Sequence, residues 1–439
     1  MLSRTVAVKK EVSTESFPVQ DYKSLPPVDR GIEAWTCCIS AFFIEFLFWG
    51  PQSSFGTFQS YYGANPPFNR STGTDITLIG TAGLALEYAA GIVLMFAFQK
   101  RPQYFKLLMW LAGIVGASFT TKVWVLIICQ GVLPGLAAAL ISFPVYIWMT
   151  QWFVERRGLA SGIMIAGASL GGVCLPLILS SLLGRFGVPW TMRIWASITL
   201  VIGTLAIYFS NPRLPPVSDT PGAKLVFSLR SFMSIQFLSI ALASCIQAAA
   251  YFPVTVFLPT QASKLGISNP NIVLSALNLA SIPSRLAWGF ASDRFSAITL
   301  LSISSASSGV LAFPLYGFGN GFGALLSFAL LFGLLAGGYS SMWAQACCSI
   351  TSKDSGQVTV LYSALFLARG TGCIVGPIVA SVLYHPSTVR EGINGSAYGL
   401  FGSGPLIILV GSLMIVSAPL SLLAHWGSSR GVKTSRQLE

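Results

Sequence analysis

The sequence predicts an all-α membrane protein with twelve transmembrane helices, arranged as two six-helix pseudo-symmetric bundles. Three observations support this prediction: apolar stretches of bilayer-spanning length, a scarcity of charge, and a Gly and Pro pattern that recurs in the second half. Of the 439 residues, 53% are hydrophobic and 9% are charged, whereas soluble proteins average about 25% charged residues. So few charges cannot cover a water-exposed surface, which disfavours a large soluble helical protein.

The apolar stretches are predicted to be helices because of their length. About 20 mostly apolar residues cross the hydrocarbon core of a bilayer, and in lipid every backbone polar group has to be hydrogen-bonded within the chain. One of the clearest stretches begins at Ala34 and ends at Phe55. The twelve predicted spans are approximately 34–55, 74–98, 107–121, 123–150, 158–184, 190–209, 231–261, 270–291, 296–316, 321–349, 357–384 and 400–424.

The distribution of positive charge predicts the orientation of these spans, because cytoplasmic loops carry an excess of Lys and Arg. Three arginines fall within spans and count toward neither side of the membrane: Arg193, Arg285 and Arg369. We place the N-terminus in the cytoplasm. The outer loops then hold only Arg70, Lys122, Arg185, Lys264 and Arg390. We therefore expect a multi-pass protein, most simply of the plasma membrane, with both termini cytoplasmic. The first ~30 residues are polar and contain no apolar signal segment, so no cleavable signal peptide is expected.

These spans divide the chain into five predicted parts. A polar, Pro-containing stretch separates the two groups of six spans. Two Asn-x-Ser sequons, at Asn69 and Asn394, fall in loops predicted to lie outside, where glycosylation takes place. The parts are a cytoplasmic tail at 1–33, a six-helix bundle at 34–209, a cytoplasmic linker at 210–230, a second six-helix bundle at 231–424, and a cytoplasmic tail at 425–439.

The two groups of six spans repeat one another in sequence. Three sets of residues recur at a near-constant separation of 201 or 202 positions: Pro51 with Pro253, Gly131 and Gly135 with Gly333 and Gly337, and Gly171 and Pro176 with Gly372 and Pro377. Gly and Pro are frequent in membrane helices in any case, but the constant separation favours a duplication. Two parallel six-helix repeats are typical of transporters that bind substrate between their halves.

Several classes of function are disfavoured. The chain has only two histidines and eight cysteines, and the cysteines fall within predicted spans without any CxxC spacing. No phosphate-binding loop, metal-ligand spacing or nucleophile elbow is present, so we expect neither an enzyme, a cofactor nor a metal. The net charge of +12 lies in loops, where it sets topology and does not indicate nucleic-acid binding. A channel is disfavoured by the duplication, while a non-transporting membrane sensor stays open.

Specific motifs carry a family resemblance. Residues 152–167, WFVERRGLASGIMIAG, resemble the fifth-span signature of the monocarboxylate porter family, a branch of the major facilitators. Residues 289–294, GFASDR, resemble the loop in which an acid and a base latch the cytoplasmic side of major facilitators. Residues 29–35, 49–58 and 251–260 match more loosely, the last two like the fungal branch. The resemblance implies a major facilitator fold and proton-coupled transport of small organic acids; fungal members also move larger metabolites.

Four of the charged residues within the predicted spans lie away from the span ends: Glu45, Glu87, Arg285 and Arg369. A charge at the bilayer centre costs ~2.5–3.5 kcal/mol on insertion scales, so each is a functional candidate. The resemblance implies that Arg285 holds the substrate carboxylate, for which a guanidinium offers two parallel hydrogen bonds. Glu45 is the first candidate for proton coupling and Glu87 the second, because a buried carboxyl group can load and release a proton.

The remaining candidates have alternative roles that the sequence leaves open. Arg369 is either a second anion contact or the counter-ion of a glutamate, and Asn278 is expected to line the same cavity as Arg285. The aromatic residues Tyr251, Trp148 and Trp343 either line that cavity or pack the core. The gate and motif candidates are Arg156, Arg157, Asp293 and Arg294.

Two departures from the family pattern affect the substrate prediction. Family members often have an aspartate one turn before the span-eight arginine and a lysine near the end of span one; here the residues are Ser281 and Gln52. Retention of Arg285 favours an organic anion. We therefore expect a secondary active transporter of a monocarboxylate-like anion that uses protons, with an exporter of a larger secondary metabolite as the alternative. The sequence indicates no oligomeric state.

Overall fold

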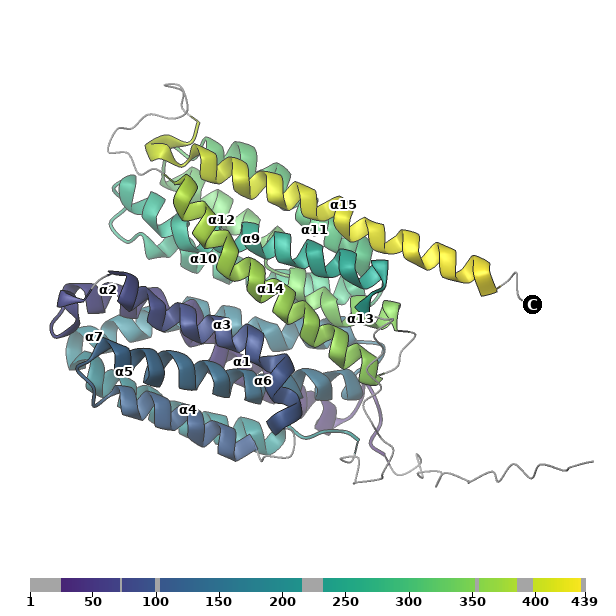
Figure 1. The fold of residues 1–439 in the computed structure, drawn as a ribbon, viewed down its shortest axis with the longest axis horizontal. Coiled ribbons are helices and arrows are strands. Elements are labelled where there is room, and N and C mark those ends of the chain that lie inside the picture. The colour runs from purple at the N-terminus through teal and green to yellow at the C-terminus, as the bar shows by residue number, and fades with distance from the viewer. Residues whose placement is uncertain are drawn as a thin grey trace, which may run out of the picture.

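The described part of the chain is entirely helical. The computed structural model describes residues 25–71, 73–98, 103–214, 232–351, 355–384 and 398–435, and no strand occurs among them. The helices form two groups that lie one above the other in Figure 1: the first half of the chain is below and the second half above. The all-α, two-bundle fold class predicted from the sequence is therefore confirmed.

The first bundle contains the helices up to α7. The bounds are α1 Ile32–Ser53, α2 Phe55–Ala64, α3 Gly73–Phe98, α4 Gln103–Ala117, α5 Val123–Leu126, α6 Leu133–Trp152 and α7 Arg157–Phe209, with a π-helical turn at Ile127–Val132 joining α5 to α6. The predicted spans 158–184 and 190–209 both lie in α7, which bends at Gly187, a residue with non-helical backbone angles (φ 67°). Glycine adopts this positive φ without the steric penalty that a side chain would bring.

The second bundle begins at α9 and ends at α15. Its helices are α9 Ile235–Lys264, α10 Asn271–Ser292, α11 Ala297–Leu311, α12 Phe322–Ala336, α13 Trp343–Ile350, α14 Ser355–Leu383 and α15 Gly404–Ser435. Short 3₁₀ turns lie at Phe68–Arg70, Tyr339–Met342 and Leu400–Gly402, and a π-helical turn at Ala312–Tyr316 extends α11.

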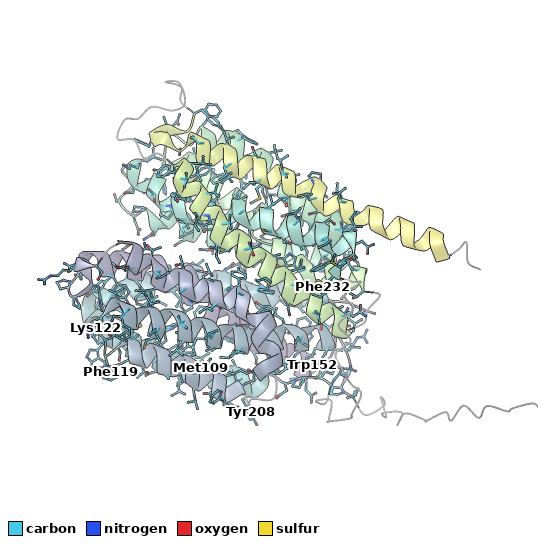
Figure 2. All side chains as sticks on the ribbon, in the orientation of Figure 1. Met109, Phe119, Lys122, Trp152, Tyr208 and Phe232 are labelled. Atoms are coloured by element: carbon cyan, nitrogen blue, oxygen red, sulfur yellow. The ribbon has the colours of Figure 1, made fainter. Side chains whose placement is uncertain are left out.

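The helices have the length and composition of membrane spans. Within the described residues, eight stretches are long and apolar enough to cross a bilayer, and the longest of them, α7, contains two of the predicted spans. Their outward faces carry many exposed large apolar side chains, such as Phe119, Val201 and Val382, which suits contact with lipid. Figure 2 places Lys122 and Trp152 at opposite ends of the molecule, as expected for residues at the two ends of one span. The chain is a multi-pass membrane protein.

Helix packing repeats between the two bundles. In the first, a Cβ atom added at Gly171 would meet the Cα atom of Gly50, so α7 and α1 touch through their backbones. In the second, a Cβ at Gly372 would meet the Cys245 carbonyl, so α14 and α9 touch in the same way. Small residues let membrane helices approach this closely. The glycine pattern recognised in the sequence therefore corresponds to equivalent helix contacts in both halves.

The two bundles meet along two helix pairs, α7 with α10 and α3 with α14. Glycines again permit the contact: Gly162 on α7 faces the Arg285 carbonyl of α10, and Gly370 on α14 faces the Tyr88 side chain of α3. Side chains of these four helices, together with α1 and α6, surround the interface between the halves.

Candidate functional site

The charges predicted to lie within the membrane gather at the interface between the bundles. Glu45 on α1 and Glu87 on α3 come from the first bundle, and Arg285 on α10 and Arg369 on α14 come from the second. Glu45, Glu87 and Arg369 are buried, and Arg285 is partly exposed. In this structure the charged groups of Glu45, Arg285 and Arg369 are close enough to interact.

Glu45 lies on the first-bundle side of the interface. A hydrogen bond joins its carboxylate to the Tyr146 side chain of α6. The charge of Arg285 acts on the same carboxylate from across the interface. Glu45 therefore has one neutral partner from its own bundle and one cationic neighbour from the other bundle, which is an arrangement that can change when the bundles move.

Glu87 has a different environment. Its side chain is fully buried, and neither carboxylate oxygen has a hydrogen-bond partner among the described residues. Its charged neighbour is Glu45, and Cys373 of α14 also lies near it. Two neighbouring acids disfavour a state in which both are ionised.

Arg285 reaches from the second bundle into the first. Its Nη1 donates a hydrogen bond to the Ile165 carbonyl of α7, whereas its Nε has no hydrogen-bond partner among the described residues. The charge of Arg369 also acts on it. One guanidinium face of Arg285 therefore holds the helix pair together, and one donor stays available for an anion.

Arg369 lies among aromatic rings. Its Nη1 donates a hydrogen bond of 2.8 Å to Oε1 of Gln247 on α9, and the Tyr88 side chain of α3 hydrogen-bonds to it as well. Its guanidinium carbon is 5.8, 5.4 and 5.5 Å from the ring centroids of Tyr251, Phe252 and Trp343. Cation–π contacts of this kind stabilise a buried guanidinium without neutralising its charge.

An aromatic cluster fills the interface next to these charges. Its centre is Phe366, one turn before Arg369 on α14, with ring centroids of its neighbours 4.8–6.1 Å from its own. The first bundle supplies four of the six neighbouring rings, and the second bundle supplies the other two. The cluster consists of Trp49, Tyr88, Phe143, Tyr146, Trp343, Tyr362 and Phe366.

The sequence indicated only part of this cluster. Trp343 and Tyr251 were candidates and lie against Arg369, while Trp148 packs at the edge of the hydrophobic core of the first bundle. Phe366 and Tyr146 were missed, because nothing in their spacing separates them from the other apolar and aromatic residues of their spans. Only the contact between α6 and α14 brings them together.

Asn278 faces the first bundle from α10. Its Nδ2 is 3.5 Å from the Gly172 carbonyl of α7, and a Cβ atom at Gly172 would meet this amide. Asn278 therefore spans the same helix pair as Arg285, two turns away along α10. Ser281, between them, donates to the Leu277 carbonyl of its own helix at 2.8 Å.

The motif residues of the 289–294 loop join the two bundles at one end of the interface. The Asp293 carboxylate accepts hydrogen bonds from the backbone N–H groups of Gly158 (2.7 Å) and Leu159 (2.9 Å), at the start of α7, and from the Gln345 amide (2.7 Å). A carboxylate at a helix N-terminus satisfies free N–H groups and interacts favourably with the helix dipole. Arg294 stacks on Phe290 of its own helix end, 4.2 Å from the ring centroid.

The basic pair at the start of α7 is organised by backbone contacts. Arg157 donates to the carbonyls of Phe153 and Thr150 and, across the bundles, to the sulfur of Cys348. The backbone N–H of Arg156 is bound by the Asp29 carboxylate. These residues lie at the same end of the interface as Asp293.

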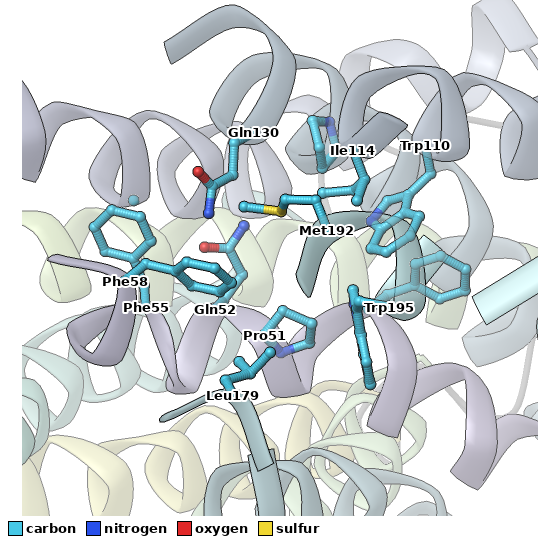
Figure 3. A pocket seen from close by; sticks show the side chains of 13 residues that line it. Pro51, Gln52, Phe55, Phe58, Trp110, Ile114, Gln130, Leu179, Met192 and Trp195 are labelled. Carbon is cyan, nitrogen blue, oxygen red and sulfur yellow. The ribbon is translucent and has the colours of Figure 1, made fainter. Parts of the chain in front are cut away.

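A small cavity of about 30 Å³ lies within the first bundle, away from the four charges. Figure 3 shows the amide groups of Gln52 and Gln130 facing each other, between Phe58 on one side and Trp110 on the other. The Tyr62 hydroxyl donates to Gln130 Oε1 at 2.7 Å. Gln52 stands near the place where the family often has a lysine, and here it faces into the first bundle.

Only one of the two predicted glycosylation sites lies within the described residues. Asn69 is exposed, in the 3₁₀ turn after α2. Helix α2 lies at the end of the molecule opposite the C-terminal end of α15 (Figure 1). Asn394 lies outside the described residues. Within the described residues, no group of three His, Cys, Asp or Glu side chains is arranged to hold a metal ion.

Comparison with known proteins decides the family. The profile of the Major Facilitator Superfamily matches residues 34–377, most of the chain. The chain belongs to the major facilitator superfamily. Members of this superfamily are transporters and not enzymes, so the expected absence of enzymatic activity is confirmed.

Relatives of this major facilitator are fungal transporters. The MFS-type transporter pynF of Aspergillus niger is 27% identical over 389 residues, which cover 87% of this chain and 88% of the relative. The fujikurins efflux protein of Gibberella fujikuroi is 24% identical over 402 residues, which cover 89% and 84%. Among solved structures, the human organic anion transporter MFSD10 matches with a TM-score of 0.66 and 13% identity, covering 89% of this chain and 100% of that one. That match shows the fold.

Proposed function

We propose that this major facilitator exports an organic anion across a membrane by alternating access, with its substrate bound between the two bundles. Arg285 and Arg369 hold the anion, Glu45 and Glu87 couple its movement to protons, and the two bundles at 34–209 and 231–424 rock around the site. The anion site is of the monocarboxylate porter type, as the fifth-span motif at 152–167 indicates.

One observation supports an anionic substrate: two guanidinium groups of the second bundle lie near one another at the interface between the bundles. Arg285 and Arg369 lie close enough for their charges to repel, in a buried environment where like charges are costly. Neither carboxylate oxygen of Glu87 has a hydrogen-bond partner among the described residues, and a buried charge without a partner is costly. The site therefore has an excess of positive charge that a carboxylate substrate relieves.

The direction of transport rests on the relatives. One of the similar proteins is an efflux protein for fujikurins, and the similarity covers most of both chains. Export of a metabolite larger than a simple monocarboxylate also agrees with the absence of the family aspartate and lysine, replaced by Ser281 and Gln52. Both termini are cytoplasmic in this proposal, as the loop charges indicate, and the membrane is the plasma membrane.

Proton coupling rests on Glu45. Its carboxylate has the Tyr146 side chain as partner on one side and the Arg285 charge on the other. An anion that binds Arg285 weakens the attraction between Arg285 and Glu45, which favours protonation of Glu45. Substrate and proton therefore bind together, and the pair of charges crosses the membrane as a neutral unit.

The test uses the full-length protein in liposomes that contain a pH-sensitive dye. A panel of labelled organic acids is added outside, and both label uptake and internal pH are followed. We expect uptake of at least one acid above that of protein-free liposomes, with a faster fall in internal pH. The protein-free liposomes correct for acids that cross the bilayer unaided. Uptake equal to that control for every acid would overturn the anion proposal, and uptake without any extra proton movement would overturn the coupling.

A further inference from the structure

The aromatic cluster between the bundles carries an inference about the substrate that rests on the proposed transport function. The rings of Trp49, Tyr88, Phe143 and Tyr146 come from the first bundle, and each is within 6.1 Å of the Phe366 ring by centroid distance. Trp343 and Tyr362 complete the cluster from the second bundle, at 5.4 Å each from Phe366.

Phe366 is a contact point that both bundles share. It stands on α14 one turn before Arg369 and is 5% exposed. A rocking motion that separates the bundles must part its ring from those of the first bundle, because Tyr146 (4.8 Å) and Phe143 (5.2 Å) belong to α6. When that happens, one face of the Phe366 ring becomes free next to the anion site.

The cluster also contains hydrogen-bond donors without partners. The indole nitrogens of Trp49 and Trp343 and the hydroxyl group of Tyr362 are buried, and none has a partner among the described residues. The relative exposure of these three side chains is 8%, 0% and 5%. Unpaired buried donors are costly, and most are satisfied in proteins. Three of them around one ring mark a place where acceptor oxygens of a ligand would bind.

We propose that the substrate is a planar, conjugated organic acid that carries carbonyl oxygens. Its carboxylate binds the guanidinium groups, its flat ring system stacks on Phe366, and its carbonyl oxygens accept hydrogen bonds from Trp49, Trp343 and Tyr362. A saturated acid of equal size has no π-face to stack on Phe366. The aromatic cluster therefore selects for flat conjugated acids, while the arginines select only for negative charge.

The experiment compares flat conjugated acids with saturated acids that have the same carbon skeleton. Pairs of labelled acids are cinnamate with 3-cyclohexylpropanoate, and naphthalene-2-carboxylate with its decahydro counterpart, each measured as protein-dependent uptake in liposomes. We expect the flat acid of each pair to be preferred about fivefold, the size of one favourable aromatic contact. Phe366→Leu should remove this preference, and Phe366→Tyr should keep it. Phe328→Leu, which alters a buried ring against Tyr316 in the second bundle, is the control for packing and should keep the preference.

The outcomes separate this inference from the proposed function. Equal uptake of flat and saturated acids by the wild-type protein overturns the substrate class and leaves anion transport standing. Preference that survives in Phe366→Leu overturns the role of Phe366. No protein-dependent uptake of any acid overturns the transport proposal itself, and the substrate class with it.

Discussion

At the scale of single residues, the two halves differ in chemistry where their sequences correspond. Glu45 in α1 has its repeat counterpart in Gln247 of α9, 202 positions later. Glu45 is hydrogen-bonded to Tyr146 within its own bundle, and Gln247 accepts from Arg369 within its own bundle. The same position therefore holds an ionisable acid in the first half and a neutral hydrogen-bond acceptor in the second. The fold is repeated in the two halves, but the chemistry of the site is not.

Arg285→Ala should reduce anion uptake by about 10- to 100-fold, because hydrogen bonds to a charged group contribute about 1.5–3 kcal/mol. Protein-dependent uptake of labelled acids in liposomes measures the effect. Arg285→Lys keeps the positive charge but cannot form two parallel hydrogen bonds to a carboxylate. Its uptake rate should therefore lie between those of the wild-type protein and Arg285→Ala. Arg193→Ala is the matched control, because Arg193 stacks on Phe119 and Trp190, away from the interface. Normal uptake by a folded Arg285→Ala protein would remove this residue from the site.

Glu45→Gln should remove the pH dependence of net uptake, because an amide can neither take up nor release the proton. Exchange of labelled for unlabelled acid, which needs no net proton movement, should persist. The measurement is the initial rate of both processes across a range of external pH, with Glu45→Asp as the control that keeps a titratable group. An unchanged pH profile in Glu45→Gln would assign coupling to another residue.

At the scale of helices, the sequence located the elements well because hydrophobic length is a local property. The predicted span 270–291 is found as α10, Asn271–Ser292, and 74–98 as α3, Gly73–Phe98. The break predicted between the spans 158–184 and 190–209 is found inside α7 at Gly187, but the sequence did not show that a single residue is enough to make it. The side-chain contacts between the two bundles could not be predicted from the sequence either. Phe366 is one of 30 phenylalanines, and only the packing of α14 on the first bundle gives it its neighbours.

The contact between the start of α7 and the end of α10 holds the bundles together at one end of the interface. We call this contact the α7–α10 joint. Gly158 and Gly289 bring the two backbones into contact, which lets the Asp293 carboxylate reach the first N–H groups of α7. The glycine contact and the carboxylate contact depend on each other, because a side chain at either glycine would move the carboxylate away from the helix end.

Gly289→Ala should loosen this joint, since a Cβ atom there would collide with the Gly158 carbonyl. We expect several-fold faster maleimide labelling of Cys348, which contacts Arg157 at the same end of the interface, measured by mass spectrometry of the peptide that contains it. Gly184→Ala is the matched control, because Gly184 lies on α7 with nothing within 4 Å of an added Cβ atom. The same labelling rate in both variants would show that the glycine contact does not hold the joint closed.

At the scale of the whole molecule, charge asymmetry predicts the orientation in the membrane. The predicted outer loops hold few Lys and Arg residues, while the linker, the tails and the opposite loops hold most of them. The helical ends agree with this division, because α2 and the end of α15 that bears the C-terminus lie at opposite ends of the molecule (Figure 1). The exposed Asn69, just after α2, would then be on the outside.

Expression in a fungal host should therefore yield a protein that is glycosylated at Asn69, because only loops outside the cytoplasm meet the glycosylation machinery. Treatment with an N-glycosidase should lower the apparent mass, and Asn69→Gln should remove the part of this shift that depends on that site. Ser71→Ala, which breaks the same sequon without changing the asparagine, should have the same effect as Asn69→Gln. Protease added to intact cells should leave an epitope at the C-terminus uncut. An epitope that is cut from outside would overturn the proposed orientation.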